Sequence, residues 1–569
     1  MAGTVAEAEL GESPVGIMSS AEPADLSNEE LAFEVIQACW RAGCREFVVC
    51  AGSRNSPLVL QLLRLVESTD ELEVWSFFEE RSAAFFALGR SKASGAPTAV
   101  VTTSGTAVAE LLPAAVEAHY ADIPLILVTA DRPPRFRGSG FPQVIEQCWI
   151  MNNFTEKTID ISGGDFGGLE RLGRRETAKH RWHVNVCFDE PLVGQPDACS
   201  AELSTAAGEV FPTNRAQFEE VEKLGAFIGT GEGLVVAAGF LRPDQRTPAV
   251  GRWLEALGCP IWAEASSGLR EDDGLSGLII RSGERYFAQN PPAKVLRIGD
   301  VPSLRFWRDL EELGETEVLS IDPPNGYAGL ARDSQVLVCD LATAIEAFPI
   351  GEQRGQTGLA GDREGWSQIC RLLEKYPQSE AAWMGRLSRE IPTGSLVFLG
   401  NSMPIREWNL AAGYGNRGLR CFASRGANGI DGQVSTFLGL TVGERESWGL
   451  FGDLTALYDL SAPWVMEQMK TGKRRLVVVN NGGGRIFSRL PHLAGLAEEK
   501  KLVTENRHQR GFGHWAAMWG LEYQKVVELD DLSLEDIAVM DSVVIELCPD
   551  PEQTENFWRE LAKAGLSSE

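Results

Sequence analysis

The 569-residue chain contains no run of about eighteen consecutive apolar residues, the length that a membrane-spanning helix needs. Its first residues are acidic, whereas a secretory signal carries basic residues before an apolar segment. Basic residues are outnumbered, because 53 Lys and Arg face 80 Asp and Glu and give a formal net charge of −27. We therefore expect no membrane span, no secretory signal and no binding to nucleic acid or anionic membranes.

Several common site motifs are also absent. The eleven cysteines include no Cys-x-x-Cys pair and are typical of free thiols in a reducing compartment, which predicts a cytoplasmic protein. His180 and His183 lack a nearby cysteine or carboxylate that would complete a zinc set, and His183 begins a predicted strand, so we assign them a structural role. Gly482-Gly483-Gly484 has neither the Lys-Ser/Thr of a P-loop nor dinucleotide-site spacing.

Apolar strand-like runs alternate with helical stretches along most of the chain, which predicts parallel α/β sheets. A chain of this length accommodates roughly three to four domains. Residues 1–26 are rich in Gly, Ala, Glu and Ser and are expected to be disordered, and residues 194–214 and 349–365 have linker composition. We therefore predict three doubly wound parallel-sheet domains, at residues 27–193, 215–348 and 366–569.

Two motifs in the third predicted domain suit a metal ion that carries a diphosphate. Gly452-Asp453-Leu454 follows the apolar run Trp448–Phe451, and Asn480-Asn481-Gly482-Gly483 follows the run Leu476–Val479. In an open α/β sheet both motifs lie at the carboxyl ends of strands, where ligands bind. Mg²⁺ takes oxygen ligands of this kind. Two ordinary Gly/Asn turns would use the same residue types, so each motif alone leaves both interpretations open.

A pair of carboxylates, Glu79-Glu80, precedes the small, apolar helix predicted at Ser82–Gly89 and follows a strand that starts at Trp75. A carboxylate at this place lies near the positive N-terminus of the helix but is partly buried, so desolvation favours its neutral form. Such a group can share a proton with a basic ring nitrogen of a ligand. The alternative is a surface pair that caps the helix, and this segment alone supports both interpretations.

Taken together, these segments resemble the 2-succinyl-5-enolpyruvyl-6-hydroxy-3-cyclohexene-1-carboxylate synthase family of thiamine diphosphate-dependent enzymes. The matching segments keep the order of that family, cover most of residues 28–550 and are looser in the central domain. They are Gly52–Pro57, Glu79–Arg81, Thr103–Ala107, Thr129–Pro134, Gln143, Gly400–Arg406, Ser424–Gly432, Gly452–Asp459 and Asn480–Pro491. The resemblance implies a thiamine diphosphate-enzyme fold, with a pyrimidine-binding first domain, a central scaffold domain and a third domain that binds diphosphate and metal.

The resemblance also implies roles for individual residues. Asp453, Asn481 and the Gly483 carbonyl group would hold Mg²⁺ or Mn²⁺, and catalytic Glu80 would hydrogen-bond the aminopyrimidine ring of thiamine diphosphate. Further cofactor contacts would come from Ser402, Asn428, Gly452, Leu454, Ile486, Phe487 and the aliphatic wedge Ile430. The substrates would be bound by Arg54, Arg132, Arg406, Arg425, Gln143, Ser402, Phe487 and Leu490, with Arg406 and Gln143 also catalytic and Arg305 a weaker candidate.

The implied reaction is decarboxylation of 2-oxoglutarate and 1,4-addition of the resulting succinyl carbanion equivalent to isochorismate, a step of menaquinone or phylloquinone synthesis. Another thiamine diphosphate-dependent 2-oxoacid decarboxylase or carboligase is the alternative, but small neutral acceptors need no guanidinium groups to bind carboxylates. A protein that merely binds a nucleotide or a partner would lack the glutamate or the metal motif. Because these two features lie in different domains, the family's sites form between subunits, and we expect a homodimer or homotetramer.

Overall fold

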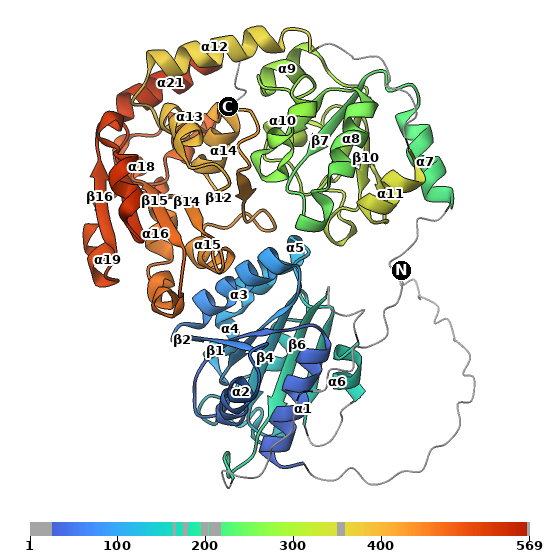
Figure 1. The fold of residues 1–569 in the computed structure, drawn as a ribbon, viewed down its shortest axis with the longest axis vertical. Coiled ribbons are helices and arrows are strands. Elements are labelled where there is room, and N and C mark those ends of the chain that lie inside the picture. The colour runs from blue at the N-terminus through green and yellow to red at the C-terminus, as the bar shows by residue number, and fades with distance from the viewer. Residues whose placement is uncertain are drawn as a thin grey trace, which may run out of the picture.

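The computed structural model describes residues 26–162, 167–174, 180–194, 203, 218–349 and 359–565. The tail predicted at residues 1–26 and the linker predicted at 194–214 lie almost entirely outside these ranges. The described residues form three α/β domains, each built on one sheet whose strands all pair in parallel. The predicted fold class is therefore correct. In Figure 1 the first domain lies below the central domain (green) and the third domain (yellow to red).

The first domain has a six-stranded sheet in the order β2-β1-β3-β4-β6-β5. Its strands are β1 (Glu46–Cys50), β2 (Glu73–Phe77), β3 (Thr98–Thr102), β4 (Leu125–Asp131), β5 (Lys157–Ile161) and β6 (Arg181–Cys187). Its helices are α1 (Asn28–Arg41), α2 (Ser56–Ser68), α3 (Glu80–Ser94), α4 (Thr106–Glu110), α5 (Leu112–Tyr120) and α6 (Gly167–Leu172). Ser27 caps α1 in a capping box with Glu30. Strand β6 begins two residues before His183.

The third domain repeats this topology, because its sheet has the order β13-β12-β14-β15-β17-β16. Its strands are β12 (Leu396–Leu399), β13 (Arg420–Phe422), β14 (Glu446–Gly452), β15 (Lys473–Val479), β16 (Glu522–Val526) and β17 (Ser542–Leu547). Its helices are α12 (Asp362–Lys375), α13 (Glu380–Glu390), α14 (Met403–Ala411), α15 (Gln433–Leu440), α16 (Asp453–Tyr458), α17 (Pro491–Ala494), α18 (Glu498–Thr504), α19 (Gly513–Met518), α20 (Leu534–Val539) and α21 (Pro551–Lys563). In both sheets the order in which the chain adds strands reverses beside the first strand of the domain, β1 or β12. Such a reversal leaves a crevice for ligands at the carboxyl ends of the strands.

The central domain has a five-stranded sheet in the order β11-β10-β9-β7-β8. Its strands are β7 (Leu234–Ala238), β8 (Ile261–Ala263), β9 (Lys294–Ile298), β10 (Glu317–Ile321) and β11 (Gln335–Leu337). Its helices are α7 (Phe218–Ile228), α8 (Pro248–Leu257), α9 (Glu284–Gln289), α10 (Arg305–Asp309) and α11 (Leu341–Ala347). The next helix, α12, starts inside the connector predicted at 349–365, because the buried Asp362 carboxylate accepts hydrogen bonds from the N–H groups of Arg281 and Ser282.

The first and third domains pack directly on each other through α3 and α15, which Figure 1 shows side by side. Glycines make the close approach possible: a Cβ atom at Gly89 would lie 2.2 Å from the carbonyl oxygen of Thr436, and one at Gly439 would lie 2.2 Å from that of Phe86. One cluster of buried apolar side chains continues across this contact, from Phe86 to Phe437. The two domains therefore share a hydrophobic core.

Within the described ranges, no helix is both long and apolar enough to cross a membrane. The cysteines of the same ranges are all free thiols.

Candidate active site

A cavity of about 130 Å³ lies in the third domain, at the carboxyl ends of β12, β14 and β15. Most of its lining was predicted from sequence as cofactor-binding. The predicted residues that line it are Ser402, Ile430, Gly452, Asp453, Leu454, Asn481, Gly483, Ile486 and Phe487. The sheet therefore gathers four separate sequence motifs around one cavity, as the topology of a doubly wound domain requires.

Asp453 begins α16 directly after β14, and only 2% of the residue is exposed. Its Oδ2 atom accepts hydrogen bonds from the N–H groups of Gly482 at 2.8 Å and Gly483 at 2.9 Å. Burial raises the pKa of this carboxyl group, while these N–H donors and His508, whose Nε2 atom lies 3.3 Å from Oδ2, oppose the shift. A cation in the cavity would further favour the ionised form.

The two asparagines of the second motif have different surroundings. Asn480 donates from Nδ2 to the carbonyl group of Arg510 and to Glu546, both at 2.7 Å. Asn481 donates from Nδ2 to Oε1 of Glu380 at 3.0 Å, and its buried Oδ1 atom has no hydrogen-bond partner among the described residues. A buried amide oxygen without a donor, in the same cavity as a carboxylate, suits a cation that prefers oxygen ligands.

The turn after Asn481 can be formed only by glycine. Gly482 and Gly483 have φ values of 78° and 136°, and a Cβ atom at Gly483 would lie 2.6 Å from the carbonyl oxygen of Glu505. Without side chains, this backbone can approach a ligand closely. The carboxylate of Asp453, the free oxygen of Asn481 and this bare turn together fit a magnesium ion with the diphosphate group of thiamine diphosphate.

Three of the predicted site residues have backbone conformations that non-glycine residues rarely adopt. Gln143, Ser402 and Asn428 have φ values of 58°, 70° and 60°. Such conformations carry strain and are concentrated at binding and catalytic sites. At Ser402, which precedes α14, the carbonyl group accepts a hydrogen bond from Nη1 of Arg406 at 2.6 Å. This contact holds the predicted substrate arginine beside the cavity.

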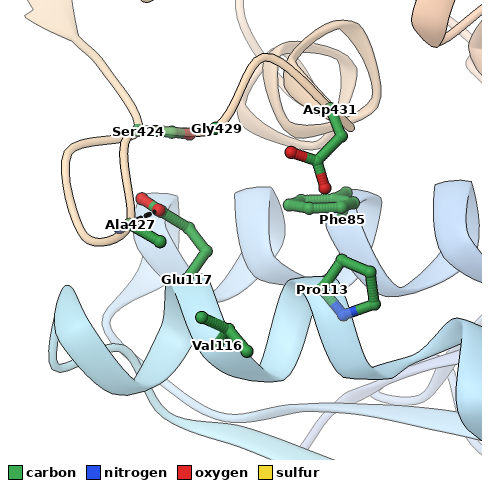
Figure 2. A pocket seen from close by; sticks show the side chains of 8 residues that line it. All are labelled: Phe85, Pro113, Val116, Glu117, Ser424, Ala427, Gly429 and Asp431. Atoms are coloured by element: carbon green, nitrogen blue, oxygen red, sulfur yellow. Dashed lines mark hydrogen bonds between the residues drawn. The ribbon is translucent and has the colours of Figure 1, made fainter.

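The loop at residues 424–432 is held by its own domain and by the first domain. On one side, Arg425 donates from Nη1 to Oδ1 of Asn401 at 3.0 Å. On the other side, Glu117 of α5 accepts from the N–H groups of Gly426 at 2.9 Å and Ala427 at 2.7 Å, and Figure 2 shows the contact with Ala427. Burial raises the pKa of Glu117, which Lys92 opposes. The loop brings Ile430 to the cavity, whereas Asn428 does not line it.

The two carboxylates at the start of α3, those of Glu79 and Glu80, lie in different environments. Glu79 caps the helix, since its side chain accepts from the N–H groups of Arg81 and Ser82. Glu80 makes no cap; burial raises its pKa, and the carboxylates of Glu79 and Glu110 add to the shift. The capping interpretation of the sequence therefore holds for Glu79, and the half-buried acid expected from the sequence is Glu80.

Glu80 does not line the cavity of its own chain. Its neighbour Arg81 donates to the carbonyl group of Tyr458, the last residue of α16, whereas Asp453 is the first residue of that helix. Glu80 and the predicted metal ligand Asp453 therefore lie toward opposite ends of α16.

The predicted substrate residues of the first domain, Arg54, Arg132 and Gln143, also do not line this cavity. Arg54 follows β1; it is buried, and it donates to the carbonyl group of Phe188 and to Glu190. Arg132 follows β4, and its guanidinium group lies 4.6 Å from the ring centre of Phe141.

Two further predicted residues do not line the cavity. Arg305, in the central domain, begins α10 and pairs with Asp309 at 3.3 Å. Leu490 follows the short helical segment Arg485–Arg489 that borders the cavity.

Several lining residues were missed. Met403, Pro404, Thr455, Gly484 and Arg485 belong to the matched motifs and could have been included on that basis. Glu380 had no signal, because it precedes Asn481 by 101 positions and lies outside every motif.

His183 is buried in the first domain and shares a 2.8 Å hydrogen bond with the hydroxyl group of Thr129. No group of three His, Cys, Asp or Glu side chains in the described ranges could hold a metal ion. The burial of His183 and its hydrogen bond to Thr129 are in keeping with the structural role predicted for it.

Comparison with known proteins gives consistent matches. Residues 29–150 match the family described as thiamine pyrophosphate enzyme, N-terminal TPP binding domain. The chain is 41% identical to the 2-succinyl-5-enolpyruvyl-6-hydroxy-3-cyclohexene-1-carboxylate synthase of Bdellovibrio bacteriovorus over 541 residues, which cover 94% of this chain and 99% of that protein. It is 40% identical to the enzyme of the same name from Akkermansia muciniphila, over 93% of this chain and 98% of the relative. A synthase of that name from Chloroflexus aurantiacus is 33% identical, with coverage of 86% and 88%.

Identity of this extent along nearly the whole length, together with the matched cofactor domain, establishes the relationship. The chain belongs to the 2-succinyl-5-enolpyruvyl-6-hydroxy-3-cyclohexene-1-carboxylate synthase family and is a thiamine diphosphate-dependent enzyme.

Proposed function

We propose that the protein decarboxylates 2-oxoglutarate and adds the remaining succinyl unit to isochorismate in a 1,4 sense. The product is the compound for which its relatives are named, an intermediate of menaquinone or phylloquinone synthesis. The observation that carries the proposal is the cavity in which Asp453 meets the unpartnered amide oxygen of Asn481. A catalyst that uses a diphosphate cofactor and a divalent cation needs such a pair.

In this proposal, Asp453, the Asn481 oxygen and the Gly483 carbonyl group hold Mg²⁺ or Mn²⁺, and the third domain binds the diphosphate group. When bound, thiamine diphosphate supplies the nucleophilic carbon and the electron sink for decarboxylation. Ile430 and Phe487, which line the cavity, contact its rings. Ser402, Asn428, Gly452, Leu454 and Ile486 complete the cofactor site.

Glu80 exchanges a proton with a ring nitrogen of the pyrimidine, which the first domain binds. Burial raises the pKa of its half-buried carboxyl group, and this direction supports the role because a less acidic carboxyl group more readily holds the proton that it exchanges. The other groups proposed for the substrate are Arg54, Arg132, Arg305, Arg406, Arg425, Gln143, Ser402 and Leu490. Burial and the charge of Arg132 lower the pKa of Arg54, and an anionic substrate would relieve that cost.

We further propose that two subunits, in a homodimer or homotetramer, combine Glu80 of one chain with the metal ligands of another. Exposed apolar side chains beside the carboxyl end of α16 support a partner there, among them Tyr458 at 52%, Leu460 at 42% and Phe78 at 57% exposed. A cytoplasmic location is in keeping with the free cysteines of the described ranges.

The test is the loss of isochorismate absorbance on addition of 2-oxoglutarate, with and without thiamine diphosphate and Mg²⁺. We expect loss only when all three additions are present. Release of CO₂ from another 2-oxoacid without consumption of isochorismate would contradict the proposed substrates and would indicate a different thiamine diphosphate-dependent decarboxylase or carboligase.

A further inference from the structure

One wall of the cavity that contains Asp453 and Asn481 is formed by a helix that contributes no residue to the proposed reaction. Glu380, the first residue of α13, is 3% exposed and lines the cavity. Its backbone N–H donates to the hydroxyl group of Thr554 in α21 at 3.1 Å, which fixes the start of α13. Its Oε1 atom accepts the 3.0 Å hydrogen bond from Nδ2 of Asn481. The carboxylate thus contacts the amide group that is proposed to bind the cation.

This contact matters because the two ends of an amide side chain are chemically different. Only the oxygen atom of Asn481 can bind a cation, and a half-turn about the last side-chain bond would replace it with the NH₂ group. A carboxylate accepts hydrogen bonds, so Glu380 selects the orientation in which the NH₂ group points to α13. The oxygen then stays buried and free of any donor in the described part of the chain.

The carboxyl group of Glu380 lies near a second buried carboxyl group, and its Oε2 atom has no hydrogen-bond partner among the described residues. Glu407 of α14 is fully buried, and neither of its carboxyl oxygens accepts a hydrogen bond from a described residue. Burial and the neighbouring Glu380 raise the pKa of Glu407 well above its usual range, which favours a proton on this carboxyl group. Burial likewise raises the pKa of Glu380, and the positive charge of Arg489 opposes the shift in both groups. The hydrogen bond from Asn481 is therefore the contact that joins the Glu380 carboxyl group to the cavity.

We propose that Glu380 is a positioning residue for the metal ion, which holds the Asn481 amide group so that its oxygen faces the cation. The identity of the cation rests on the proposed function. Partners that orient a metal ligand from outside the coordination sphere typically change metal affinity by about 10- to 100-fold when they are removed.

The experiment measures Mn²⁺ binding to the full-length protein by electron paramagnetic resonance in the presence of thiamine diphosphate, without substrates. Glu380→Leu should raise the Kd for Mn²⁺ by about tenfold or more, because the amide group is no longer oriented. Glu380→Gln should change it by less than about threefold, because the new side chain keeps an oxygen for Asn481 and turns its NH₂ group toward Glu407. Glu374→Ala, at an exposed position of the neighbouring helix α12, is the matched control and should bind as the wild type does.

A double variant separates orientation from a general structural effect. In Glu380→Leu/Asn481→Asp the carboxylate presents an oxygen in either orientation, so Mn²⁺ binding should return to within about threefold of the wild type. Thermal unfolding without ligands checks that each variant folds, and Glu380→Ala, which adds no bulk, replaces the leucine variant if that variant does not fold.

Two results would overturn the inference: wild-type affinity in the folded Glu380→Leu or Glu380→Ala protein, or a double variant that binds Mn²⁺ no more tightly than the single one. Failure of the proposed function gives a different pattern. In that case the wild type binds Mn²⁺ together with thiamine diphosphate but does not consume isochorismate, and the role of Glu380 stands.

Discussion

Burial shifts the pKa of single residues in this protein, and the neighbouring groups determine whether such a residue caps a helix or is available for proton transfer. Glu79 and Glu80 are adjacent in sequence, yet one caps α3 while the pKa of the other is raised by burial. Burial shifts the pKa of His183 in the other direction and lowers it to about 4. Both shifts have testable consequences, one for turnover and one for stability.

Glu80→Gln should abolish turnover and leave binding of thiamine diphosphate with Mg²⁺ within about threefold of the wild type. The amide keeps the shape of the side chain but cannot exchange a proton with the cofactor ring. Steady-state rates and a fluorescence titration with the cofactor measure the two effects. Wild-type turnover in this variant would remove Glu80 from the mechanism.

His183→Gln should reduce the loss of stability in acid. In the unfolded chain the imidazole binds a proton near pH 6.5, whereas the folded protein resists it until about pH 4. The unfolded state therefore binds more protons within this window, so stability is complete above pH 6.5 and falls as the pH decreases toward 4. Between pH 7 and pH 5 this group accounts for about 2 kcal/mol.

Thermal unfolding midpoints at pH 7 and pH 5 measure the effect. The wild type should lose more degrees than His183→Gln, whose side chain can still hydrogen-bond the hydroxyl group of Thr129. Equal losses in the two proteins would show that His183 does not contribute to acid sensitivity.

At the scale of elements, close contacts between α3 and α15 and between α5 and the loop 424–432 join the first domain to the third. The helix contact depends on two glycines, and the loop contact depends on the Glu117 carboxylate, which Figure 2 shows pointing at Ala427. The same loop carries Arg425 and Ile430. Domain packing is therefore coupled to the shape of the proposed cofactor site.

Gly89→Ala tests the helix contact. Alanine favours an isolated helix over glycine by about 1 kcal/mol, so helix propensity alone predicts a more stable protein. We expect the reverse, a loss of about 2 to 3 kcal/mol, because the new Cβ atom would lie 2.2 Å from a backbone carbonyl oxygen that cannot move by itself.

The matched control is Gly251→Ala in α8, where the nearest atom is the flexible carboxylate tip of Asp272, also at 2.2 Å. Thermal unfolding of both variants measures the difference. A higher midpoint for Gly89→Ala than for the wild type would contradict close packing of α3 on α15.

At the scale of the whole molecule, the first and third domains have the same strand order, and each carries proposed site residues at the carboxyl ends of its strands. Within one chain the two groups do not meet, because Glu80 is absent from the cavity of Asp453 and Asn481. We therefore expect a second copy of the chain to complete the proposed site.

Mixed oligomers test this arrangement. Neither Glu80→Gln nor Asp453→Asn should be active alone, because each affects every site. If the two are unfolded together and refolded as random dimers, about half of the dimers contain both chains, and each of these has one intact site. We therefore expect about one quarter of the wild-type activity. No recovery of activity would contradict a site shared between subunits.

Much of the architecture could be predicted because parallel α/β domains have strong local patterns. Apolar runs such as Leu476–Val479 identify strands, and polar residues directly after them, such as Asp453, identify the ligand edge. The boundary before α12 was predicted too late, because its first residue is fixed by contacts with the central domain.

The sequence by itself determined the three parallel sheets and the motifs after their strands, because periodicity and turn chemistry act between residues that are close along the chain. The order of those motifs also indicated the family by resemblance. Only the tertiary structure decided that Asn481 rather than Asn480 keeps a free oxygen, that Glu380 accepts from its amide group and that Glu80 does not line the cavity. These features arise where separate elements meet, and Glu380 and Asn481 are 101 positions apart. No local pattern encodes a contact over that separation; packing of the folded chain creates it.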